Sequence, residues 1–129
     1  MKTNTDPRHL RRIRLVKALY SQQFPHCKAP KLGPEDTVFL KSLLAKLAKL
    51  NVEIDRYSRK FGVEKMVKID LSILQLGAYE LLYEKQVPAK VVMDEAIELA
   101  KEFGSSKSPS LINGILAKIY EQKNLNGRA

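Results

Sequence analysis

Four arginines near the start of the chain are suited to holding phosphate groups. They fall within seven residues, and a lysine and a tyrosine follow them (Arg8, Arg11, Arg12, Arg14, Lys17 and Tyr20). The guanidinium group matches phosphate oxygens in a bidentate geometry, and an aromatic ring can stack on an unpaired base, as in the recognition of single-stranded RNA. The pattern predicts an RNA-binding segment. The alternatives are a solubilising arginine surface and a Tyr20 that belongs to the core.

The distribution of charge also favours a polyanionic partner. The 129 residues hold 23 Lys and Arg against 14 Asp and Glu, a formal net charge of +9. Residues 1–31 contain eight of the basic residues and one acid, Asp6, which leaves 15 basic and 13 acidic residues in the rest of the chain. Such a localised excess attracts nucleic acid first and an acidic membrane surface second. RNA is favoured over DNA because no helix-turn-helix spacing is evident.

Catalytic and metal-binding patterns are missing from the sequence. His9 and His26 have no carboxylate at a helical offset, so we expect surface histidines. The single cysteine, Cys27, excludes an internal disulfide and a thiolate zinc cluster. The six glycines are scattered, so no glycine-rich loop can hold a nucleotide. We therefore expect a protein that is not an enzyme and needs no cofactor.

An acidic stripe recurs at helical spacing later in the chain (Asp94, Glu95, Glu98 and Glu102). A carboxylate metal site would need histidines three residues after such glutamates, and none follow. We expect a solvated helix face, with a docking surface for a basic partner as the alternative.

No targeting or membrane feature is apparent. The sequence contains no run of 18 apolar residues and no apolar stretch behind the N-terminal charges. With one cysteine, it is compatible with a reducing cytosol. The expected location is therefore the cytoplasm.

Helical periodicity dominates the first half of the chain, without strand-like alternation. Asp6 and Pro7 predict the start of a helix over 7–24. Its arginines are expected to face outward, and its inward-facing apolar arc consists of Leu10, Ile13, Val16, Tyr20 and Phe24. Pro34 follows a loop over 25–33 and predicts a long helix over 35–61, bent near Asn51 and ended by Gly62. Its apolar seam, Leu40–Phe61, packs inside a bundle or, alternatively, forms an intermolecular coiled coil.

The second half predicts three more helices. Residues 69–83 are apolar nearly all round, which is typical of a buried central helix, and Gly77 indicates a close helix approach there. Pro88 and Gly104 bracket the next helix, with Phe103 facing inward, and Ser108, as N-cap, and Pro109 begin the last. The fold class is therefore all-α, a compact bundle of five to seven helices in one domain over 1–129.

Four stretches, in order and spacing, resemble the NusB family of transcription antitermination factors, and the resemblance covers nearly the whole chain. They are RRIRLVKALYSQQF at 11–24, IDLSILQLGAYELLY at 69–83, VPAKVVMDEAIELAKEFG at 87–104 and SLINGIL at 110–116. The resemblance implies a NusB-like helical fold and a non-enzymatic role. It also implies binding to boxA RNA as a heterodimer with NusE, a small-subunit ribosomal protein, which helps RNA polymerase in its elongation complex to read through terminators.

The resemblance also implies which residues contact RNA. The family's opening arginines match Arg8 and Arg12, its tyrosine matches Tyr20, and three further positions near the RNA side match Lys90, Asn113 and Gly114. We add Arg11, Lys17 and Lys107 as expected RNA-binding cations.

The sequence departs from the family pattern at three of its positions. Ile13 replaces a glutamate, Lys107 replaces an acid and Leu111 replaces an aromatic residue. Lys107 should strengthen phosphate attraction while blunting sequence discrimination, because phosphate contacts carry no sequence information. The short 25–33 loop suggests that a helix of longer relatives is missing.

Two other functional classes remain open. One is a stand-alone accessory domain of an rRNA methyltransferase, and the other is a helical protein-interaction module or homodimer that uses the Leu40–Phe61 seam. The acidic stripe is a candidate contact for NusE on charge alone.

Overall fold

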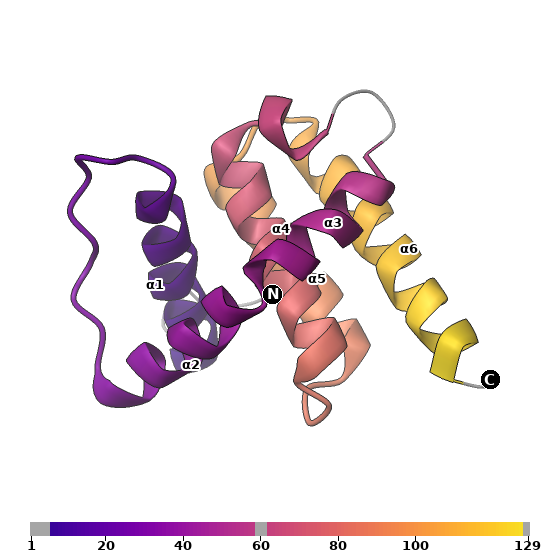
Figure 1. Cartoon of the computed structure of the whole chain (residues 1–129), viewed down its shortest axis with the longest axis horizontal. Coiled ribbons are helices and arrows are strands. Elements are labelled where there is room, and N and C mark those ends of the chain that lie inside the picture. The colour runs from indigo at the N-terminus through magenta and orange to yellow at the C-terminus, as the bar shows by residue number, and fades with distance from the viewer. Residues whose placement is uncertain (1–5, 59–61, 128–129) are drawn as a thin grey trace.

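The computed structural model describes residues 6–58 and 62–127, and within them the fold is all α-helical (Figure 1). The elements are α1 (Pro7–Gln22), α2 (Pro34–Ala45), α3 (Leu47–Arg56), a 3-10 turn η1 (Val63–Lys65), α4 (Lys68–Tyr83), α5 (Ala89–Phe103) and α6 (Ser108–Gly127). Six α-helices over the described residues confirm the predicted all-α class.

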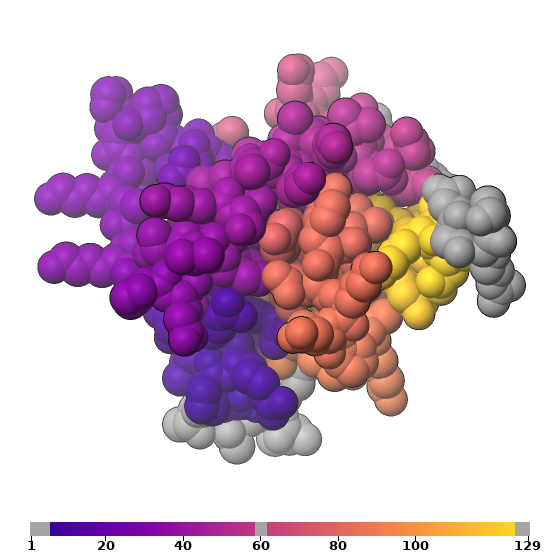
Figure 2. Space-filling view, turned by 60° about the horizontal axis from the view of Figure 1, so that its bottom comes forward, coloured from indigo at the N-terminus to yellow at the C-terminus, as the bar shows by residue number. Residues whose placement is uncertain are grey.

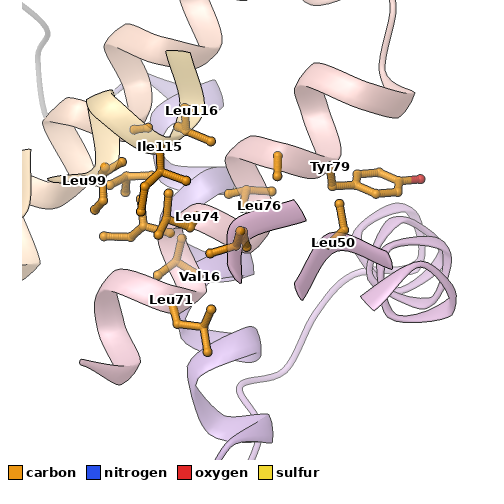
Figure 3. Close-up of a cluster of buried hydrophobic side chains, with 14 of the residues drawn as sticks. Val16, Leu50, Leu71, Leu74, Leu76, Tyr79, Leu99, Ile115 and Leu116 are labelled. Atoms are coloured by element: carbon orange, nitrogen blue, oxygen red, sulfur yellow. The ribbon is translucent and has the colours of Figure 1, made fainter. Parts of the chain in front are cut away.

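Helix α4 is the centre of the bundle, as its uniformly apolar sequence predicts. Its residues 70–81 are all buried, and α1, α3, α5 and α6 contact it. Figure 3 shows Leu74 and Leu76 of α4 among side chains of the other helices, including Leu99 and Leu116. A Cβ at Gly77 would lie 2.9 Å from Cδ1 of Leu116, which confirms the predicted close approach.

The predicted long helix over 35–61 is wrong in its continuity and its end. Lys46, with φ −104° and ψ 3°, separates α2 from α3, and α3 ends at Arg56. Asn51 lies within α3, where its Oδ1 accepts a hydrogen bond of 3.0 Å from Gln75. Gly62 precedes η1 rather than ending a helix, and Phe61 lies outside the described residues.

The break at Lys46 lets both short helices bury apolar residues against the same core. Leu43 of α2 and Leu50 and Ile54 of α3 are completely buried. The described part of the seam therefore packs inside this chain, which is the first of the two predicted uses.

Helix α1 begins as predicted but is rotated relative to the predicted arc. Asp6 is its N-cap and accepts a hydrogen bond of 2.9 Å from the backbone N–H of Arg8. Leu10 and Tyr20, both expected to face inward, are 38% and 37% exposed. Two polar residues, His9 and Arg12, are buried instead, because carboxylates of α4 and α5 meet them.

The ends of α5 and α6 follow their sequence markers closely. Gly104 is the C-cap of α5, as predicted, and its N–H donates to the carbonyl of Ala100. Ser108, expected as the N-cap, is the first residue of α6, and its Oγ accepts a hydrogen bond from the N–H of Ser105.

Candidate nucleic-acid interface

Arg8 is the most exposed of the predicted RNA-binding arginines on α1. Its side chain is 84% exposed, and Nε lies 3.5 Å from Asp6. The backbone hydrogen bond from Arg8 lowers the pKa of Asp6, so the helix cap stays ionised to a lower pH than a free aspartate would. A solvated ion pair of this kind holds its arginine weakly, which leaves Arg8 available to a phosphate.

Arg11 and Arg14 share the carboxylate of Asp36 at the start of α2. The contacts are 2.8 Å from Nε of Arg11 and 3.1 Å from Nη2 of Arg14. Hydrogen bonds from Arg11 first, and then from Arg14, lower the pKa of Asp36. The arginine side chains are 41% and 47% exposed. Asp36 therefore holds both guanidinium groups at the surface and partly neutralises them.

Arg12 lies in the interior, so the expectation that it belongs to the exposed cationic side of the helix is wrong. Its Nε and Nη2 donate to the two carboxylate oxygens of Glu80 on α4, at 3.0 and 2.7 Å. Burial alone would lower the pKa of Arg12, but the hydrogen bonds to Glu80 and the negative charges around the guanidinium together outweigh it, and the pKa is raised. This bidentate pair fastens α1 to the central helix, and any contact of Arg12 with RNA stays a prediction.

His9 is also buried, which contradicts the expected surface histidine. Nδ1 lies 2.8 Å from Glu95 and Nε2 lies 3.2 Å from Glu102, both on α5. Burial lowers the pKa of His9, but the hydrogen bonds to Glu95 and Glu102 prevail and raise it overall. The partners were missed because they lie 86 and 93 residues away in sequence.

The acidic stripe is accordingly divided between two environments. Glu95 is buried and Glu102 contacts His9, so the expected fully solvated face is wrong for this half. Asp94 is exposed, and Glu98 pairs with Lys101 at 4.0 Å. No cluster of three or more metal-binding side chains occurs in the described residues. Nor does any helix described there have the length and apolarity to cross a membrane.

A groove of about 390 Å³ lies beside Lys17 and Tyr20, between α1, the 25–33 loop, the start of α4 and the end of α5. Lys28 and Phe103 also line it. Phe103 is 37% exposed, in contrast to the inward position expected for it. The ring of Tyr20 packs at 4.9 Å from that of Phe24. The groove therefore combines apolar rings with two lysines, and Lys28 and Phe103 could be recognised only once the loop was placed.

The remaining predicted RNA contacts are exposed but distributed. Lys90 lies in the first turn of α5, Lys107 in the connection to α6, and Asn113 and Gly114 on α6. At 1.5 Å per residue, α5 separates Lys90 from Lys107 by about 20 Å. Figure 2 shows the start of α1 and the connection between α4 and α5 on one face of the molecule. A ligand that reaches all these residues must be extended.

Comparison with known proteins supports a single family. The model of the NusB family matches residues 8–121. A protein of Thermotoga maritima called transcription antitermination protein NusB is 32% identical over 90% of this chain and 92% of its own length. The protein of that name from Clostridium kluyveri is 42% identical over 59% of this chain, and the match spans about half of that protein (49%). A solved structure of T. maritima NusB superimposes with a TM-score of 0.80 at 29% identity, over 95% of this chain and 94% of the other.

Proposed function

This chain belongs to the NusB family of transcription antitermination factors, which are not enzymes, and we propose that it binds boxA-type single-stranded RNA through the exposed side of α1. The observation that carries this proposal is the ridge of solvent-accessible cations at i, i+3 spacing, which winds about half a turn around α1 from Arg8 through Arg11 and Arg14 to Lys17 and the groove beside Tyr20. Cations that lie along one helix can neutralise successive phosphates of a flexible strand.

The exposed residues take two roles in this proposal. Arg8, Arg11 and Lys17 neutralise phosphates, and Lys90 and Lys107 do so from the two ends of α5. Tyr20 contacts a base at the mouth of the groove, where base stacking on an aromatic ring contributes about 1–3 kcal/mol, and Asn113 contacts a base from α6. Arg12 acts by holding α1 against Glu80.

The proposed partners are NusE and the RNA polymerase elongation complex. In this proposal the chain acts in the cytoplasm as a single domain and promotes read-through of terminators in ribosomal RNA operons. Asp94 and Glu98 remain candidates for the contact with NusE, because they are the members of the acidic stripe that do not face His9.

The test is the salt dependence of RNA binding, measured by fluorescence anisotropy with a boxA RNA and a scrambled RNA, with and without NusE. If each of the five cations neutralises one phosphate, the log–log slope should be about −3.5, since each phosphate contributes about −0.7 for a single strand. Replacing Arg8, Arg11 and Lys17 together by alanine should reduce the slope to about −1.4, because Lys90 and Lys107 remain. The triple variant Lys41→Ala/Lys101→Ala/Lys118→Ala is the matched control, because it removes three exposed cations that lie outside α1. An unchanged slope in the α1 variant would refute the assignment.

A further inference from the structure

A second groove lies away from α1, between α3, the end of α4 and the second half of α6. Its volume is about 390 Å³, and its apolar lining comes from Val52, Leu82, Tyr83 and Ile119. Val52 is 56% exposed and Tyr83 is 37% exposed, whereas Leu82 is partly buried and Ile119 belongs to the core, so the open part of the lining is Val52 and Tyr83. When a partner covers apolar surface that is exposed in a groove, the free energy of the system falls.

Positive charge surrounds this groove from two helices. Lys49 and Arg56 of α3 and Lys123 of α6 line it, and Lys46 lies one turn before Lys49 with its Nζ 5.3 Å from the centre of the Tyr83 ring. Glu53 is the acid among the lining residues, and it pairs with Arg56 at 3.0 Å. Positive groups therefore outnumber negative ones, which makes the groove complementary to an acidic ligand.

The surroundings of Tyr83 decide between an RNA and a protein ligand. Lys46 lies over its ring, and Tyr79 packs against it at 5.4 Å between ring centres. Both neighbours reduce the ring surface on which a base could stack, whereas an aliphatic side chain needs only the open surface of Val52 and its neighbours. Nζ of Lys123 donates to the carbonyl of Leu81 and so holds α6 beside the end of α4.

We propose that this groove docks an acidic amphipathic segment of a partner protein. The segment places aliphatic side chains on Val52, Leu82 and the exposed part of Tyr83, and its carboxylates face Lys46, Lys49 and Arg56. This is the helix-in-groove mode of recognition, in which apolar anchors repeat at helical spacing. The site shares no residue with the α1 interface, so one molecule can hold RNA and the second partner together.

The probe is a fluorescein-labelled synthetic peptide with leucines at i, i+3 and i+7 and glutamates at most other positions. A peptide of the same composition with scrambled order is its control. We expect the patterned peptide to bind the full chain and to shift the amide NMR signals of Val52, Tyr83 and Ile119. Equal binding of the scrambled peptide, no binding of either peptide, or shifts confined to α1 would overturn the proposal.

Charge-reversal variants test the rim of the groove. The double variant Lys46→Glu/Lys49→Glu should weaken peptide binding about tenfold, because two attractive rim charges become repulsive. Lys41→Glu/Lys101→Glu changes the net charge equally at exposed sites outside the groove and should leave the affinity nearly unchanged. Equal losses in the two variants would show a general charge effect and overturn the site. Val52→Asp removes an exposed anchor without altering the core, and it should also weaken binding.

An oligouridylate supplies the final arm of the experiment. It should shift signals of α1 and leave those of the second groove in place, and the Lys46→Glu/Lys49→Glu variant should bind it as the unaltered chain does. If the oligonucleotide rather than the peptide shifted Val52 and Tyr83, the groove would be an RNA site and the proposal would be wrong. Because the two ligands are read at separate residues, failure here is distinguishable from failure of RNA binding at α1.

Discussion

The Arg12–Glu80 pair predicts that one arginine of the cationic helix supports RNA binding through stability alone. The guanidinium makes two charge-assisted hydrogen bonds, and the two side chains are only 11% and 7% exposed. Arg12→Leu therefore leaves the carboxylate of Glu80 inside the protein, without a cation and nearly without water. Arg8→Ala is the matched change at an arginine that is 84% exposed.

The expected magnitude follows from burial. Removing one partner of a buried ion pair costs about 3–5 kcal/mol, whereas an exposed pair contributes about 0–1 kcal/mol. Arg12→Leu should therefore lower the free energy of unfolding by about 3–5 kcal/mol and the Tm by about 10–20 °C. The double variant Arg12→Leu/Glu80→Leu should recover most of this loss, because it removes both charges and fills the space with apolar side chains.

Urea unfolding followed by circular dichroism measures the free energy of unfolding of each variant. Fluorescence anisotropy with boxA RNA, at a temperature low enough to keep the variants folded, measures their affinity for RNA. We expect the double variant to bind RNA nearly as well as the unaltered chain, and Arg8→Ala to bind less well at unchanged stability. The reasoning is refuted if Arg12→Leu costs less than about 1 kcal/mol, or if the double variant is stable but has lost its affinity for RNA.

Three further predictions follow from contacts described above. Protonated His9 is stabilised in the folded chain, so its contribution to the free energy of unfolding is fully present below the ordinary pKa of 6.5 and is lost as the pH rises through the raised pKa. Urea unfolding midpoints measured across this pH range should fall accordingly, and His9→Gln should abolish this pH dependence. Gly77→Ala should destabilise the chain by about 1–2 kcal/mol through its clash with Leu116, although alanine favours helix. The Cβ added by Gly114→Ala meets no atom within 4 Å, so this change should stabilise the chain by about 0.5–1 kcal/mol and raise the Tm. Equal effects of the two glycine substitutions would contradict this reasoning. Asp36→Asn should raise RNA affinity a few-fold at low salt by releasing its two arginines, and an unchanged affinity would show that they do not contact RNA.

The sequence predicts the helices well where local chemistry decides their limits. Asp6, Pro34 and Gly104 stand at helix ends, and the unbroken apolar run of α4 identifies the central element. The break at Lys46 was not predictable in this way, because lysine favours helix and no local residue type marks the interruption between the buried Leu43 and Leu50.

The candidate site was predicted less completely, since its polar partners are distant in sequence. Helical periodicity predicts that Arg12 is exposed, because charged residues are usually found at the surface. Arg12 is buried because its guanidinium pairs with the carboxylate of Glu80, which lies 68 residues later in the sequence. His9 was misassigned for the same reason. The exposed positions of Arg8 and Arg14 were predicted correctly, because they depend only on the local helix.

The single cysteine of the chain lies in the groove beside Tyr20, and its thiol is exposed. A reagent that alkylates thiols will therefore attach to this molecule at one place, at the rim of the predicted base-binding groove. An environment-sensitive dye on Cys27 would report occupancy of the groove in the native sequence, without any engineered attachment point. Oxidation of the same sulfur would add bulk and charge at that place, so samples handled without reductant should lose ligand affinity with age while their helical content stays the same.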